Sequence, residues 1–171
     1  MKIIGMDVPT SRNLGWSVSD CGFVMVAGQA EMSEPFAKNL NTLVSALILE
    51  HQPDIIVMER PCGQFANIVG KLWRSAGMIE MTCSIADVKV DYMSPSEIDR
   101  MLGFKRTKGL KRKDQIRKFI FEELHIDIHP KQQHRADAIA VSTAYHRKVE
   151  HGAGDIIEED EYGFTSTQKG A

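Results

Sequence analysis

The chain of 171 residues is 43% hydrophobic and 26% charged, which is typical of one soluble globular domain of ordinary size. Its formal net charge of -2 at pH 7 combines an acidic C-terminal segment with a basic remainder, so it does not exclude a polyanionic partner. The longest apolar run, residues 43–49, is too short to span a bilayer, and no signal peptide is recognisable. We therefore expect a cytoplasmic protein with no membrane partner. Three cysteines without a C-x-x-C pair indicate neither a disulfide framework nor a zinc knuckle.

The first 30 residues have the alternating pattern of β-strands. Strands are predicted at residues 1–7, 14–20 and 23–30, and Asn13 and Gly22 lie near the intervening turns. Short turns between successive strands favour an antiparallel meander.

The middle of the chain alternates between helical and strand patterns. Apolar residues at three- and four-residue steps predict helices at about residues 35–51 and 65–83. Short β-branched runs predict a buried strand within residues 53–60 that ends at Glu59, and another strand at residues 87–93.

Helices follow in the C-terminal part, at about residues 94–102, 113–124 and 134–148. In the first of these, Ser94 is the expected N-cap and Glu97 completes a capping box. Five strands and these helices predict an α/β fold, with a five-stranded mixed sheet flanked by helices.

Two of the predicted strands end in a carboxylate. Asp7 ends the first strand and Glu59 the fourth, so the two acids meet at one edge of the sheet if those strands are neighbours. His134 and Asp137 are three residues apart and share a face of the last helix. One histidine and three carboxylates from distant parts of the chain would make a hard-cation site for Mg²⁺ or Mn²⁺.

Four segments around these residues resemble, in order, the blocks of the RuvC-type Holliday-junction resolvases. They read IIGMDVPTSRNLGWSV, IIVMERPCGQ, YMSPSEIDRMLGFKRTKGLKRKDQIRKFI and HRADAIAVSTAYH. The resemblance covers about residues 1–148. It implies an RNase H-like fold and a metal-dependent endonuclease that resolves four-way DNA junctions as a homodimer. Paired symmetric nicks leaving 5′-phosphate and 3′-hydroxyl ends are expected.

The resemblance also implies roles for individual residues. It assigns Asp7, Glu59 and Asp137 to the metal-binding carboxylates, and the family's fourth position falls on His134. Two ions per site, Mg²⁺ or Mn²⁺, are expected, with Asp7 bridging them and Glu59 holding one. His134 and Asp137 would hold the other. Lys113 matches the family's basic residue near the scissile phosphate.

Other residues are expected to contact DNA. The basic segment supplies Lys105, Arg106, Lys108, Lys111, Arg112, Lys113, Arg117 and Lys118. Arg100 is the nearest candidate for a second family lysine. Cys62 stands where the family has an aromatic wedge, and Phe65 is the nearest aromatic residue. The apolar stripe that follows Phe65 is either core or a dimer interface.

These observations divide the chain into an RNase H-like nuclease domain at residues 1–149 and an acidic tail at residues 150–171, which is expected to be disordered. Three other functions stay open. A nuclease of the same fold could cleave other branched DNA or RNA, and a junction-binding module could lack catalysis. A phosphate-binding domain like those of actin and the sugar kinases is disfavoured, because residues 7–13 lack a cluster of glycine and threonine.

Overall fold

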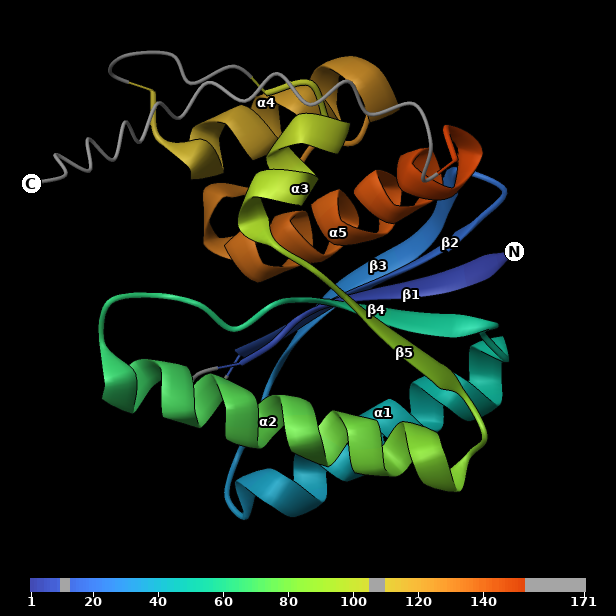
Figure 1. Ribbon diagram of the computed structural model, residues 1–171, viewed down its shortest axis with the longest axis vertical. Helices are drawn as coiled ribbons and strands as arrows, with labels where there is room; N and C mark the ends of the chain where they lie inside the picture. The colour runs from blue at the N-terminus through green and yellow to red at the C-terminus, as the bar shows by residue number, and fades with distance from the viewer. Residues whose placement is uncertain (10–12, 105–109, 153–171) are drawn as a thin grey trace, which may run out of the picture.

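A single mixed sheet forms the centre of the protein (Figure 1). The structure is a computed structural model that describes residues 1–9, 13–104 and 110–152. The strands are β1 (Lys2–Asp7), β2 (Asn13–Asp20), β3 (Phe23–Glu31), β4 (Ile55–Glu59) and β5 (Lys89–Met93). Their order is β3-β2-β1-β4-β5; β2 lies antiparallel to β1 and β3, whereas β4 is parallel to β1 and β5. The predicted five-stranded mixed sheet is confirmed.

Helices cover both faces of this sheet. They are α1 (Phe36–His51), α2 (Ala66–Ile85), α3 (Pro95–Met101), α4 (Arg112–Leu124) and α5 (Gln133–Glu150). Figure 1 shows α1 and α2 on one face and α3, α4 and α5 on the other. The predicted capping box is present, since Ser94 Oγ accepts from the Glu97 amide at 3.2 Å and Glu97 Oε2 accepts from the Ser94 amide at 2.8 Å. A short 3₁₀ helix, η1 (Pro130–Gln132), precedes α5 and was not predicted.

Three further expectations concern membrane-spanning helices, the cysteines and the acidic tail. Within the described residues, no helix combines the length and the apolar character needed to cross a membrane. The three cysteines are free. The predicted acidic tail lies outside the described residues from position 153 onward.

Alternation along the strands divides the apolar core into two layers. Ile3, Ile55 and Val57 face α3–α5, whereas Ile4 and Ile56 face α1 and α2. Successive strand residues point to opposite faces of a sheet. Asp7 and Glu59 are therefore on the face that α5 covers.

Helix α5 packs unusually close to β1 and β2 because each strand presents a glycine to it. A Cβ atom on Gly5 would lie 2.5 Å from the carbonyl oxygen of Ala138. On Gly15 it would lie 1.8 Å from the carbonyl oxygen of His134. Any larger side chain at these two positions would push the helix away from the sheet.

A line of buried polar contacts fixes the rotation of α5 on the sheet. Ser17 Oγ donates to the carbonyl oxygen of Ala138 at 2.9 Å and lies 2.8 Å from Ser142 Oγ. Further along, His146 Nε2 lies 3.0 Å from Ser19 Oγ, and burial lowers the pKa of His146. A helix turned by one residue would leave these groups buried without partners, which is costly. The contacts therefore set the direction in which His134 and Asp137 point.

Candidate functional site

Asp7 and Glu59 lie at the carboxyl ends of two neighbouring parallel strands. The register pairs Met6 of β1 with Met58 of β4, so the two acids follow at equivalent positions. Both carboxylates are partly buried, with side-chain exposures of 22% for Asp7 and 23% for Glu59. The neighbouring strands that the sequence argument required are thus present, and the two acids lie at one edge of the sheet.

His134 reaches Asp7 from the first turn of α5. Its Nδ1 lies 2.5 Å from Asp7 Oδ2, and this hydrogen bond raises the pKa of His134. The close approach at Gly15 involves the backbone of His134 itself. A glycine inside β2 therefore positions the histidine that contacts the end of β1.

Asp137 lies one turn further along α5. Its Oδ1 accepts a hydrogen bond from Gln133 Nε2 at 2.9 Å. Burial is the main cause that raises the pKa of Asp137, and the negative charge of Asp7 adds to it, whereas Lys113 acts in the opposite direction. Asp7 and Lys113 are therefore both close enough to Asp137 for their charges to act on it.

Glu59 has a strongly raised pKa. Burial raises its pKa to about 6, the nearby charges of Asp7 and Asp137 add to this rise, and Arg112 opposes it. Arg112 Nη1 donates to Glu59 Oε2 at 3.3 Å and to Oε1 at 3.5 Å. The cluster holds more negative charge than its surroundings readily accept, which is typical of a functional site.

The donor chemistry of these side chains fits a hard divalent cation, because three carboxylates and one imidazole are ligands that Mg²⁺ and Mn²⁺ accept. Their present positions do not yet form a chelating set. In the described part of the chain, no group of three or more His, Cys, Asp or Glu side chains is arranged to hold one ion. His134 contacts Asp7, Arg112 contacts Glu59 and Gln133 contacts Asp137.

The expected DNA-contacting residues fall into three groups. Arg100, Lys111, Lys113 and Lys118 are exposed. Arg112 faces inward to Glu59 and Asp99, and Arg117 pairs with Asp114 of the same helix. Lys105, Arg106 and Lys108 lie outside the described residues. Their contacts with DNA stay predictions.

The two candidates for a wedge lie in the connection between Glu59 and α2. Cys62 is exposed, and Phe65, at the N-cap of α2, is 67% exposed. Because this connection starts at the end of β4, both side chains stand on the segment directly after the acid cluster.

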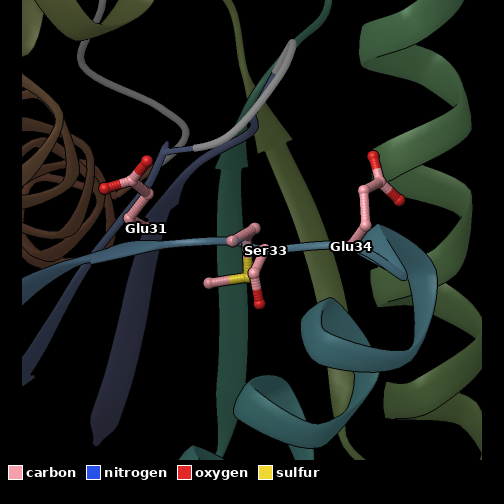
Figure 2. A pocket seen from close by; sticks show the side chains of 4 residues that line it. Glu31, Ser33 and Glu34 are labelled. Atoms are coloured by element: carbon pink, nitrogen blue, oxygen red, sulfur yellow. The ribbon is translucent and has the colours of Figure 1, made fainter.

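A pocket lies apart from this cluster, on the linker between β3 and α1. Glu31, Met32, Ser33 and Glu34 line its volume of about 350 Å³. Figure 2 shows Glu31 and Glu34 on either side of Ser33. Its two carboxylates and lack of a basic lining residue make it unsuitable for a DNA phosphate.

Three residues shape the site in ways that the sequence did not predict, and one of them, Arg112, was expected only to contact DNA. Gly15 brings α5 onto β2, Gln133 binds Asp137, and Arg112 binds Glu59. An isolated glycine inside a strand pattern indicates close backbone approach, so Gly15 was recognisable in principle. Nothing in the sequence distinguished Arg112 from its basic neighbours.

The order of the strands and the two helical layers define an RNase H-like fold of the RuvC type. RuvC of Thermus thermophilus in complex with a Holliday-junction substrate superposes with a TM-score of 0.75 at 16% identity, covering 89% of this chain and 96% of that chain. Thermus thermophilus RuvC in another structure gives 0.70 at 17% identity, covering 89% and 97%. The predicted resemblance is confirmed at the level of the fold.

A mitochondrial relative of this fold is also similar. The yeast mitochondrial Holliday-junction resolvase Ydc2 superposes with a TM-score of 0.59 at 12% identity, covering 85% of this chain and 77% of that chain. Neither a protein-family model nor a curated protein matches the sequence. At such identities the similarity establishes the fold, and function has to be argued from the site.

Replacing Gly15 by alanine should destabilise the protein, because the new methyl group would overlap the carbonyl of His134. We expect the free energy of unfolding in urea to fall by about 1–3 kcal/mol, as in other overpacked cores. Gly77→Ala is the matched control, since no heavy atom lies within 4 Å of a Cβ there and alanine favours the helix. Equal stability of Gly15→Ala and the wild type would contradict the close packing of α5.

Proposed function

We propose that the chain is a divalent-metal-dependent endonuclease that cleaves branched DNA, with the four-way junction as its preferred substrate. The observation that supports this most is the meeting of Asp7, Glu59, His134 and Asp137 at one edge of the sheet, beside Lys113. The fold adds support, because RuvC of Thermus thermophilus shares it and is described in complex with a Holliday-junction substrate.

The electrostatics of the cluster favour a cation-binding role. Burial raises the pKa of both Glu59 and Asp137, and repulsion from the neighbouring acids adds to this rise. In a purely structural site this repulsion would only reduce stability. Asp7, Glu59, His134 and Asp137 would hold Mg²⁺ or Mn²⁺, two ions per site, and the ions would supply Lewis-acid catalysis of phosphodiester hydrolysis.

The proposed reaction is the hydrolysis of one phosphodiester bond, and basic residues of the chain would hold the DNA during it. Water adds to the phosphorus and the bond to the 3′-oxygen breaks, which leaves a 5′-phosphate and a 3′-hydroxyl. The ammonium group of Lys113 would neutralise charge on the non-bridging oxygens. Exposed Arg100, Lys111 and Lys118 would bind neighbouring phosphates, and such contacts position DNA without reading its sequence.

We propose further that two copies assemble into a homodimer, since paired nicks on opposite strands require two sites. The N-terminal half of α2 suits this role, because large apolar side chains are exposed along it. Phe65, Ile68 and Trp73 are exposed there, at 67%, 43% and 44%. Leu72 and Ala76 from the same predicted stripe instead pack into the core. The stripe is therefore partly core, and its exposed residues are available for a second copy.

The proposed activity is tested by incubating the protein with labelled four-way junction, replication fork and linear duplex in Mg²⁺ or Mn²⁺. We expect symmetric paired nicks in the junction and at least about 100-fold slower cleavage of the duplex, a difference of about 2.7 kcal/mol in activation free energy. Religation of the products by DNA ligase would identify 5′-phosphate and 3′-hydroxyl ends. Equal cleavage of linear duplex would contradict the substrate, and binding without cleavage would favour a non-catalytic module.

Metal should stabilise the wild-type protein and not the Asp7→Asn variant. At a metal concentration of about 100 times Kd, binding adds about 2.7 kcal/mol, which corresponds to about 5–10 °C in Tm for a chain of this length. Asp127→Asn, an exposed aspartate, is the matched control and should keep the full rise. The rise should shrink below about pH 6, because protons then compete for Glu59. An unchanged rise in Asp7→Asn would contradict the metal assignment.

A charge on the exposed N-terminal half of α2 should dissociate the dimer. Sedimentation velocity is expected to give a dimer for the wild type and a monomer for Ile68→Asp. Ile85→Asp places the same charge near the far end of α2, at a residue that is 84% exposed, and should stay dimeric. If Ile68→Asp sediments as the wild type does, α2 is not the interface.

A further inference from the structure

Arg112 is a basic residue whose side chain points into the acid cluster. We infer, building on the proposed metal dependence, that Arg112 is a positioning residue that holds Glu59 in the metal-free protein and gives up that carboxylate when a divalent cation binds. Arg112 would thus occupy the place of the cation on Glu59.

The contacts of Arg112 join three elements of the fold. Arg112 is the first residue of α4, Asp99 lies in α3 and Glu59 ends β4. The guanidinium donates through Nε to Asp99 Oδ1 at 2.7 Å and through Nη1 to Glu59 at 3.3 and 3.5 Å. The side chains of Arg112, Asp99 and Glu59 are only 32%, 32% and 23% exposed, so water screens these charges less than it would on an open surface.

The two contacts differ in strength. The 2.7 Å bond to Asp99 has the length of a strong charge-assisted hydrogen bond. The bonds to Glu59 are longer, and both oxygens share one nitrogen. Arg112 Nη2 is buried and finds no acceptor within the described residues. Asp99 is therefore the anchor of the guanidinium, and Glu59 is the partner that can be exchanged.

The partners of the other two acids support this assignment. Asp7 contacts His134, itself a candidate ligand, and Asp137 contacts the neutral amide of Gln133. Arg112 differs from both because a guanidinium remains charged at any pH at which the protein is folded. A divalent cation on Glu59 would meet this positive charge directly. Binding of the cation and the Arg112–Glu59 contact are therefore competing events.

A merely structural role of Arg112, tying α4 to the sheet, makes different predictions. In that case its removal would lower stability by the same amount whether or not metal is present, because the contact with Glu59 would persist in both conditions. Competition requires that the effects of Arg112 and Glu59 be coupled, and that metal change this coupling. Double-mutant cycles measure such coupling directly.

The experiment measures thermal unfolding of the wild type, Arg112→Gln, Glu59→Gln and the double variant in EDTA and in MnCl₂, with calorimetric titration of Mn²⁺. In EDTA, we expect Arg112→Gln to lower Tm in the wild type and to have a smaller effect in the Glu59→Gln background. The rise in Tm from EDTA to Mn²⁺ should be larger for Arg112→Gln than for the wild type. The Mn²⁺ affinity of Arg112→Gln should be about fivefold higher, at the lower end of typical coupling between two binding events.

Two further variants complete the design. Arg112→Lys keeps the charge but loses the fork that reaches both carboxylates, so its Mn²⁺ affinity should lie between those of the wild type and Arg112→Gln. If Arg112→Gln does not fold, Arg112→Lys is compared with the wild type in its place. Arg117→Gln is the matched control, because Arg117 pairs with Asp114 within α4, and its Mn²⁺ affinity should equal that of the wild type.

Each unexpected outcome identifies which statement is wrong. Additive effects of Arg112→Gln and Glu59→Gln in EDTA would overturn the inference, whatever the metal does. Equal Mn²⁺ affinity of the wild type and Arg112→Gln would also overturn it. Coupling in EDTA without Mn²⁺ binding to any variant would instead overturn the proposed metal dependence, and the exchange with it.

Discussion

The direct contact of helix α5 with strands β1 and β2 is the constraint on which the candidate site depends. Gly5 and Gly15 let the backbone of α5 approach the sheet, and the atom that approaches Gly15 is the carbonyl oxygen of His134. The buried hydroxyls of Ser17 and Ser142 then fix the rotation of the helix. Packing at the centre of the sheet thus determines the side-chain geometry at its edge, where His134 meets Asp7.

This packing brings three carboxylates together, and each of them has a hydrogen-bonding partner within the protein. Glu59 is held by Arg112, Asp7 by His134 and Asp137 by Gln133. The pairing leaves the pKa of Glu59 at about 6, so the compensation is incomplete. Such a cluster is stable enough to fold and still favours an added positive charge. Because each acid is already held by a partner within the protein, no three of the His, Cys, Asp and Glu side chains in the described residues are arranged around one ion.

The sequence predicted the parts of this arrangement that depend on local patterns. Asp7 and Glu59 were recognised because a strand pattern ends at each of them, and His134 and Asp137 because three residues span one helical turn. Whether the strands of Asp7 and Glu59 are neighbours depends on sheet order, which no local pattern specifies. Arg112 was read as one cation in a basic run, because the direction of its side chain depends on Asp99 and Glu59 in other elements. Tertiary contacts of this kind leave no periodic signal.

The charge distribution also bears on whether the site performs chemistry or only binds DNA. A module that merely holds a junction gains nothing from carboxylates beside the backbone, because Asp7, Glu59 and Asp137 would repel its phosphates. The chain nevertheless positions these acids near Lys113, whose positive charge acts on Asp137. Opposite charges at one edge suit a reaction in which a phosphate and a cation must meet. The fold alone would allow either role, and it is this juxtaposition that favours hydrolysis over binding.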